Sequence, residues 1–266
     1  MRRALAPLLV DPAATAIVSD FDGTLSPIVD RPGDARPLDG TAELLVALSR
    51  RFKTVAVVSG RPVSFLVEHL TGRASVPGTG GASPLFVGLY GLEVATADGR
   101  IVPDPEAEGW RPVIDEVVDR LRAGAPVGTL VESKGLAVTV HWRTAPAAAS
   151  WASAAVGDEA ERTGLVPHPG RCSLELRPPL AIDKGSVTER LLQGCSAGCY
   201  LGDDLGDLPA FAALAHAATV GGTVTVAVAV ADDESAPAVL EAADLVLDGP
   251  VEAFAALRWL AGEAGG

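Results

Sequence analysis

The sequence has few cysteines and no arrangement of them that would form a disulfide framework. Only Cys172, Cys195 and Cys199 occur in 266 residues. A low, odd count argues against a disulfide scaffold. Cys195 and Cys199 lack a second pair of ligands nearby, which argues against a zinc site. We therefore expect all three to be small, apolar side chains of the interior.

Basic residues are also scarce. Lysine and arginine together number 21, against 34 aspartates and glutamates, so the formal net charge is −13. A chain this acidic is poorly suited to cover a phosphate backbone, so we exclude nucleic acid as a partner. A small phosphorylated substrate is not excluded, because a few local cations or a metal ion can bind it.

Long apolar runs are absent as well. No run approaches the length of a membrane span, so we expect no membrane partner. The first residues resemble a signal peptide only weakly, since the apolar stretch is short and is interrupted by Pro7. Cleavage near Ala16 would also cut into the first expected strand. The expected location is the cytoplasm, and the expected state is a monomer.

The remaining composition is that of an ordinary globular protein. Hydrophobic residues make up 48% and charged residues 21% of the chain, which excludes a disordered protein. The length fits one large domain, or one domain that carries a smaller one.

In both terminal parts of the chain, expected strands, loops and helices alternate. This alternation predicts an α/β fold with a Rossmann-like, doubly wound parallel sheet. The expected strands are residues 16–19, 54–58, 85–90, 198–201 and 223–230, with a hairpin around Asp98-Gly99. The expected helices are residues 38–52, 62–70, 184–193, 207–217 and 251–261. Such sheets bind ligands at the carboxyl ends of their strands, where Asp20 and Ser59 stand.

In the middle of the chain the expected order is different: a helix is followed by two strands, and this order occurs twice. The expected helices are residues 106–123 and 146–163, and the expected strands are 129–134, 136–143, 165–169 and 172–177. This order predicts a smaller α+β domain inserted into the core. We place the core at residues 1–103 and 178–266 and the insert at 104–177.

Four short motifs lie in the core. They are Asp20-Phe21-Asp22-Gly23-Thr24, Ser59-Gly60-Arg61, Lys184-Gly185, and Gly202-Asp203-Asp204 with Asp207. Any one of them is compatible with a plain turn. Together they gather carboxylates whose repulsion calls for a hard divalent cation, and Mg²⁺ suits such oxygens. A carboxylate in such a site can attack phosphorus, a second can protonate the leaving oxygen, and Ser59 and Lys184 can bind phosphate oxygens.

These motifs, in this order, resemble the signature of the haloacid-dehalogenase-like (HAD-like) phosphatases. The resemblance implies that Asp20 is the nucleophile and Asp22 the general acid and base. It implies that Asp20, the backbone carbonyl of Asp22, and Asp203 hold Mg²⁺. By the same resemblance Asp204 and Asp207 support the metal site, while Ser59, Gly60 and Lys184 bind the phosphate, and the insert is a cap domain that selects the substrate.

The strands of the insert have one polar and one apolar face, because side chains alternate along a strand. The polar set is Glu132 and Lys134, then Thr139, His141 and Arg143, then Ser173, Glu175 and Arg177. Donors and acceptors mixed in this way suit a polyhydroxylated ligand such as a sugar. The alternative is a solvated sheet face with ion pairs.

Parts of the insert and core resemble the trehalose-6-phosphate phosphatase family. The similar segments are Val131 to Leu136, His141-Trp142-Arg143, Glu175 to Pro179 and Gly91-Leu92-Glu93. The resemblance implies that Glu132, Lys134 and Glu175 contact the sugar unit remote from the phosphate. The substrate-binding set expected here also includes Arg61, His141 and Arg143, with Glu93 near the site. Many members have His where Tyr90 stands, so no role is carried over to Tyr90.

The expected function is therefore Mg²⁺-dependent hydrolysis of trehalose 6-phosphate through an aspartyl-phosphate. Alternatives within the enzymes are phosphatases of glucosylglycerate phosphate, sucrose phosphate or a pseudo-disaccharide phosphate, and a phosphomutase. A non-catalytic sugar-phosphate sensor is the alternative from another class. The intact catalytic set argues against the sensor.

Overall fold

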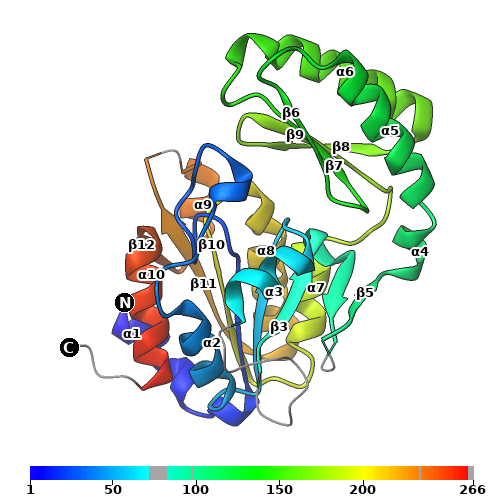
Figure 1. Ribbon diagram of the computed structural model, residues 1–266. Helices are drawn as coiled ribbons and strands as arrows, with labels where there is room; N and C mark the ends of the chain where they lie inside the picture. Colours follow the sequence, from blue (N-terminus) through cyan, green and yellow to red (C-terminus); the bar gives the residue numbers. More distant parts are fainter. Residues whose placement is uncertain (72–82, 97–98, 234, 263–266) are drawn as a thin grey trace. The chain divides into compact units, whose positions relative to one another are not determined.

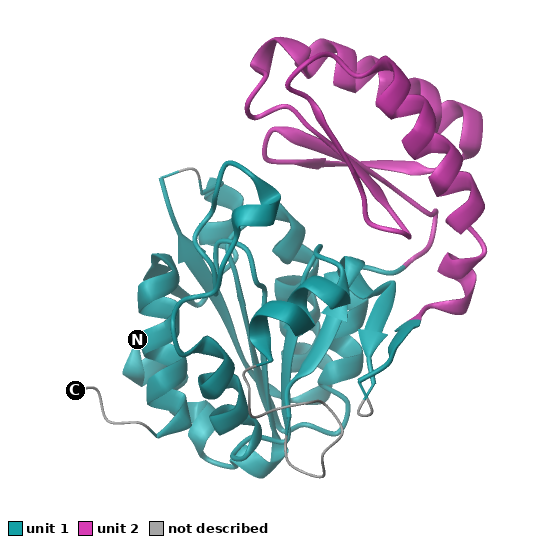
Figure 2. Cartoon of the chain, viewed as in Figure 1, with its two compact units in different colours: residues 1–102, 182–266 teal, residues 103–181 magenta. Residues whose placement is uncertain are grey.

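The computed structural model describes residues 1–71, 83–96, 99–233 and 235–262 (Figure 1). The chain forms two compact units (Figure 2). The first unit comprises Met1–Val102 and Ile182–Gly266, and the second comprises Pro103–Ala181. The second unit thus begins one residue before, and ends four residues after, the range 104–177 expected for the insert. Asp98 of the expected hairpin turn lies outside the described residues.

Within the described residues, the first unit is built on an eight-stranded sheet. Its strands, in spatial order, are β12 (Leu245–Asp248), β11 (Val224–Ala231), β10 (Ala197–Gly202), β1 (Thr15–Ser19), β2 (Thr54–Val58), β3 (Leu85–Gly88), β4 (Glu93–Ala95) and β5 (Ile101–Pro103). The pairs from β12 to β3 are parallel, whereas β4 runs antiparallel to β3. The predicted α/β fold with a parallel sheet is therefore confirmed.

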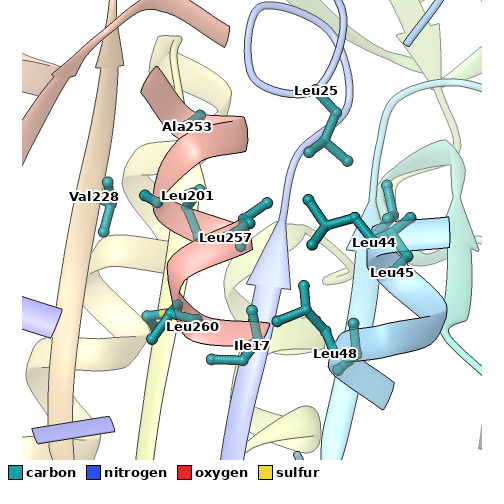
Figure 3. Close-up of a cluster of buried hydrophobic side chains, with 14 of the residues drawn as sticks. Ile17, Leu25, Leu44, Leu45, Leu48, Leu201, Val228, Ala253, Leu257 and Leu260 are labelled. Atoms are coloured by element: carbon teal, nitrogen blue, oxygen red, sulfur yellow. The ribbon is translucent and has the colours of Figure 1, made fainter. Parts of the chain in front are cut away.

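Successive residues of the central strands pack into two separate cores, one on each face of the sheet. Ile17 of β1 lies in one core with Leu48 of α2 (Thr41–Ser49), and its neighbour Val18 lies in the other with Phe211 of α8 (Leu208–Gly221). Figure 3 shows the first core, where Ile17, Leu201 and Val228 lie near leucines of α2 and of α10 (Gly249–Ala261). Burial on both faces explains why these strands are almost continuously apolar.

The helices of the first unit precede, connect or follow these strands in the chain. They are α1 (Arg2–Leu5), α2 (Thr41–Ser49), α3 (Val63–Leu70), α7 (Lys184–Leu191), α8 (Leu208–Gly221), α9 (Pro237–Glu241) and α10 (Gly249–Ala261). Short 3₁₀ turns are η1 (Ala6–Leu9), η2 (Pro12–Ala14), η3 (Pro32–Asp34), η4 (Leu89–Gly91) and η6 (Leu205–Asp207). Strand β12 and helix α9 were not expected from the sequence. Strand β3 ends at Gly88, earlier than expected, because Leu89 and Tyr90 adopt positive φ angles of 50° and 61°.

The second unit is a four-stranded antiparallel sheet with helices on one face. Its strands, in spatial order, are β6 (Leu130–Ser133), β7 (Val138–His141), β9 (Ser173–Arg177) and β8 (Val166–Gly170). Its helices are α4 (Pro105–Glu108), α5 (Arg111–Gly124), η5 (Pro146–Ala148) and α6 (Ala149–Thr163). Val140 and Leu176 pack against Val117 and Val156 of the helices. The opposite face of this sheet carries the polar side chains, together with the exposed Leu130 and Val166.

The predictions for the cysteines and for membrane-spanning segments can be compared with the structure. Cys199 is buried and Cys195 is partly buried, but Cys172 is exposed. The prediction of an interior Cys172 is wrong, because this residue lies in the turn between β8 and β9 with a φ of 51°. Among the described residues, no helix is both long and apolar enough to cross a membrane.

Gly88 provides a test of how the sheet positions the loop after β2. A Cβ at this position would lie 2.6 Å from the backbone nitrogen of Val63 and 2.8 Å from the carbonyl oxygen of Arg61. Because backbone cannot move aside easily, Gly88→Ala should lower the free energy of unfolding by about 1–3 kcal/mol. Chemical denaturation measures this loss. The control is Gly157→Ala in α6, where a Cβ has no atom within 4 Å; it should stabilise by up to about 1 kcal/mol. Equal effects would contradict the packing argument.

Candidate active site

Three predicted site residues lie at the same edge of the parallel sheet. Asp20 follows β1, Ser59 follows β2 and Asp203 follows β10. Strand β1 lies between the other two, with Ser19 in register with both Val57 and Leu201. The Asp20 backbone nitrogen continues this register, donating to the Leu201 carbonyl at 2.8 Å. The pairing of the strands therefore brings together residues that are far apart in the sequence.

Lys184 is the buried cation of this site. It is the first residue of α7, which Asp183 caps through a hydrogen bond from the Ser186 nitrogen. Its Nζ lies 3.0 Å from Asp20 Oδ2 and 2.6 Å from Asp207 Oδ1. Only 3% of the Lys184 side chain is exposed. Burial alone would lower the pKa of Lys184, but the charges of Asp20 and Asp207 outweigh it and hold the pKa well above its ordinary value.

Asp207 is a fully engaged carboxylate. Its Oδ1 accepts from Lys184 Nζ at 2.6 Å and from the Tyr200 hydroxyl at 2.8 Å. Its Oδ2 accepts from the backbone nitrogens of Asp203 and Asp204 at 3.0 and 3.2 Å. With its lone pairs used in this way, Asp207 orients Lys184 and the Asp203-Asp204 turn. Asp204 in turn caps η6 by accepting from the Gly206 nitrogen at 2.8 Å.

Asp20 and Asp203 lie in a part of the site that has more carboxylates than cations. Burial is the main reason why the pKa of each is raised well above the ordinary value. Lys184 lowers the pKa of Asp20, but repulsion from Asp207 acts in the opposite direction. The pKa of Asp203 is further raised by Asp20. An additional cation would relieve this repulsion.

The donor atoms fit a hard divalent cation. One ligand atom each of Asp20, Asp203 and Asp207 can be chosen so that all three lie within 4.8 Å of one another. Because Asp207 already accepts four hydrogen bonds, Asp20 and Asp203 are the better ligands. Gly23, with a φ of +72°, allows Asp203 to approach the loop after β1, since a Cβ there would lie 2.1 Å from Asp203 Oδ2. Carboxylate and backbone oxygens are what Mg²⁺ and Ca²⁺ prefer.

Ser59, Gly60 and Tyr90 form one corner of the site. Ser59 is buried, and its backbone carbonyl accepts from the Tyr90 nitrogen at 2.9 Å. The Tyr90 hydroxyl lies against Gly60, where a Cβ would be 2.4 Å away. The ring centroid of Tyr90 is 5.9 Å from Lys184 Nζ. Tyr90 is thus placed beside the predicted phosphate-binding residues.

Arg61 and Asp22 form a two-point ion pair. Arg61 Nε lies 2.7 Å from Asp22 Oδ2, and Arg61 Nη2 lies 2.7 Å from Asp22 Oδ1. Glu93, expected near the site, accepts a hydrogen bond from the backbone nitrogen of Val63, the first residue of α3. This contact gives Glu93 a role in fixing the start of that helix.

The second unit holds a buried charge cluster on the polar face of its sheet. Lys134 Nζ lies 2.8 Å from Glu175 Oε1, and Arg177 Nη2 lies 2.6 Å from Glu175 Oε2. The Thr139 hydroxyl also donates to Glu175 Oε1 at 3.1 Å. Burial raises the pKa of Glu175, but the charges and hydrogen bonds of Lys134 and Arg177 outweigh it and lower the pKa to about 2. This carboxylate is therefore ionised and rigidly held.

Glu132 and His141 form a second, more accessible pair on that face. His141 Nε2 lies 2.9 Å from Glu132 Oε2, and about a quarter of each side chain is exposed. Arg143 lies outside the strand that was expected to contain it. Strand β7 ends at His141, and Arg143 lies in the turn that follows. The alternation that was expected to place Arg143 on the polar face therefore does not extend to it.

Three contacting residues were absent from the predicted site. Arg177 and Thr139 bind Glu175, and both could have been found, because they lie on the same strand face as the predicted residues. Tyr200 donates to Asp207 from inside β10. It had no sequence signal, because a tyrosine in an apolar strand reads as a core residue.

Comparison with known proteins shows similarity over most of the chain. A family model described as trehalose-phosphatase matches residues 18–244. A trehalose-phosphate phosphatase from Mycobacterium avium (strain 104) is 35% identical over 209 residues, which are 75% of this chain and 51% of that protein. The chain spans about half the length of the curated relatives that it matches.

Solved structures show the same fold. The C-terminal domain of a C. albicans trehalose-6-phosphate phosphatase has a TM-score of 0.75 at 21% identity, covering 98% of this chain and 96% of that chain. A phosphatase of the haloalkanoate (HAD) superfamily from Bacteroides thetaiotaomicron has a TM-score of 0.54 at 14% identity, covering 92% of this chain and 94% of that chain. With the family model matching most of its length, the chain belongs to the trehalose-phosphatase family and has the fold of the HAD superfamily.

Proposed function

We propose that the protein is a Mg²⁺-dependent phosphatase that hydrolyses trehalose 6-phosphate to trehalose and phosphate. The observation that carries the proposal is the buried Asp20, held 3.0 Å from Lys184 at the carboxyl edge of a parallel sheet. A nucleophilic carboxylate beside a fixed ammonium is suited to attack a phosphoryl group whose charge the ammonium offsets. Membership of the trehalose-phosphatase family supports the choice of substrate.

In the first step, an Asp20 carboxylate oxygen attacks phosphorus and forms the aspartyl-phosphate bond. The bond between phosphorus and the sugar oxygen breaks, and its electron pair goes to that oxygen. The carboxyl group of Asp22 gives its proton to the same oxygen, so trehalose leaves as the neutral alcohol. Lys184, Ser59 and the backbone at Gly60 bind the phosphate oxygens.

In the second step, a water molecule attacks phosphorus. The Asp22 carboxylate takes a proton from this water, and the bond between phosphorus and Asp20 breaks with its electron pair returning to Asp20. Phosphate leaves and both carboxylates are restored to their starting states.

Asp20, Asp203 and the backbone carbonyl of Asp22 would hold the Mg²⁺ ion, with Asp204 and Asp207 fixing the turn that carries Asp203. The ion supplies positive charge that offsets the repulsion between buried carboxylates and phosphate. The raised pKa values of Asp20 and Asp203 in the absence of a cation support this assignment.

The polar face of the second unit provides the recognition of the sugar in this proposal. Glu132 and His141 are partly exposed, and Lys134 and Glu175 form a rigid charged pair. Sugar hydroxyl groups both donate and accept, and this face offers both kinds of partner. Arg143 is retained as a candidate contact at the end of β7.

The experiment that tests the substrate is phosphate release on a panel of compounds. The panel contains trehalose 6-phosphate, sucrose 6-phosphate, glucosylglycerate phosphate and glucose 6-phosphate, each with Mg²⁺ or with EDTA. We expect strong preference for trehalose 6-phosphate that EDTA abolishes. Preference for another member would overturn the assigned sugar while keeping the phosphatase chemistry.

Asp20→Asn tests the nucleophile. The amide cannot form the aspartyl-phosphate, so kcat should fall by roughly a thousandfold or more. The melting temperature should not fall, because one of the mutually repelling carboxylates is removed. Steady-state phosphate release and thermal melting measure the two effects. Turnover at the wild-type rate would contradict the assigned nucleophile.

Asp203→Asn tests the metal site without measuring activity. Mg²⁺ at about 100 times its dissociation constant should stabilise the folded protein by about 2.7 kcal/mol, which is roughly 5–10 °C in melting temperature. In Asp203→Asn, most of this increase in melting temperature should be lost, because the substitution removes the negative charge of one ligand. Asp158→Asn, on the exposed side of α6, is the matched control. An undiminished shift in Asp203→Asn would exclude this carboxylate as a ligand.

Glu132→Gln and Glu175→Gln test recognition of the sugar. Each should lower kcat/KM for trehalose 6-phosphate about tenfold to a hundredfold, because a charged hydrogen bond contributes about 1.5–3 kcal/mol. Turnover of a small aryl phosphate should change little. Glu116→Gln, an exposed carboxylate of α5 in the same unit, is the control. Equal losses on both substrates would argue against a role in sugar binding.

A further inference from the structure

We propose that Arg61 is a positioning residue that acts through Asp22, rather than a direct contact of the sugar. This inference rests on the proposed function and assigns Arg61 a part in its proton transfer. Both Asp22 oxygens are held by the guanidinium, at 2.7 Å from Nε and 2.7 Å from Nη2. The Arg61 side chain is 11% exposed and that of Asp22 is 32% exposed. The pair is therefore shielded on the arginine side and open on the carboxylate side.

The orientation of Arg61 is itself fixed by neighbouring groups. Arg61 Nη1 donates to the Pro32 carbonyl at 2.6 Å, and the guanidinium lies 4.6 Å from the centroid of the Phe65 ring. The Phe65 ring packs edge-on against Phe21, the residue between Asp20 and Asp22, at 5.6 Å between centroids.

The backbone of Arg61 is held as well. Its nitrogen donates to Ser59 Oγ at 3.1 Å, and its carbonyl accepts from the Leu89 nitrogen at 3.0 Å. The planar group thus presents its two donors to Asp22 from a fixed position, which a flexible ammonium could not reproduce.

This geometry fixes the direction in which the Asp22 side chain points. Two parallel N–H bonds from a planar group define both the position and the plane of the two oxygens that they hold. Transfer of a proton to the leaving oxygen requires an oxygen of Asp22 within hydrogen-bond reach of that atom. Without Arg61 the side chain would lose this fixed direction, and the proton transfer would be less effective.

The consequence depends on the leaving group. A sugar oxygen is strongly basic and needs the proton as its bond to phosphorus breaks, whereas a nitrophenolate leaves without one. Loss of Arg61 should therefore lower kcat/KM most for the most basic leaving groups. Because kcat/KM covers only the steps through departure of the leaving group, the later hydrolysis of the aspartyl-phosphate does not obscure the effect.

The experiment measures kcat/KM for a series of aryl phosphates of increasing leaving-group pKa in wild type, Arg61→Met, Asp22→Asn and the double variant. Aryl phosphates carry no sugar, so loss of a sugar contact cannot produce the effect. We expect Arg61→Met to steepen the dependence on leaving-group pKa, with roughly a tenfold loss for the most basic member and little change for the least basic. In the Asp22→Asn background, the same change should cause no further loss.

Arg111→Met is the matched control. Arg111 also forms a two-point pair with a carboxylate, Glu108, but both are exposed on the second unit. Its kinetics should equal those of wild type. Thermal melting checks that each variant is folded, and Arg61→Lys, which keeps the charge but not the planar fork, replaces Arg61→Met if the latter does not fold. It should show the same steepening to a smaller extent.

Two outcomes would overturn the inference. An equal loss for all leaving groups would assign Arg61 to phosphate binding or to general folding. A loss of the same size in the presence and absence of Asp22 would show that Arg61 does not act through this carboxylate. If wild type hydrolyses no phosphate ester, the proposed function itself fails, which is a result distinct from either of these.

Discussion

The buried ammonium of Lys184 is the interaction on which the rest of the site depends. It lies between Asp20 and Asp207, and removal of this one cation would leave several carboxylates without a counter-charge. Isolated charges are very unfavourable in a protein interior. The hydroxyl of Tyr200 and the backbone of the turn at residues 203–204 then satisfy Asp207. The negative charges of Asp20 and Asp203 are then not fully offset. These are the residues at which the proposed reaction needs added positive charge.

The pKa of a buried carboxylate is shifted in opposite directions in the two units. Asp20 shares one cation with other acids, so burial and repulsion raise its pKa. Glu175 is equally buried but has both Lys134 and Arg177, which lower its pKa to about 2. The balance of local charge, rather than burial, decides the direction. A group with surplus negative charge suits a site that takes up a cation and a phosphate, and a neutralised cluster suits the binding of uncharged hydroxyl groups.

Much of the fold could be predicted from the sequence because its strands are short apolar runs that end in polar residues. The parallel sheet then required Asp20, Ser59 and Asp203 to meet at one edge, which the register of β10, β1 and β2 provides. Prediction was weakest where local backbone geometry overrides pattern. Positive φ angles end β3 early and expose Cys172, and the turn after His141 removes Arg143 from the strand face.

By itself the sequence determined the order of the motifs, the residue types at the strand ends and the alternation of polar and apolar positions. These follow from local periodicity and need no knowledge of neighbours. Only the tertiary structure decided how each carboxylate is used. Asp207 is saturated by donors from four other residues, and Asp22 is held by Arg61, which is 39 positions away in the chain. A hydrogen bond depends on distance and direction in space, and these arise only when the sheet places separate loops side by side.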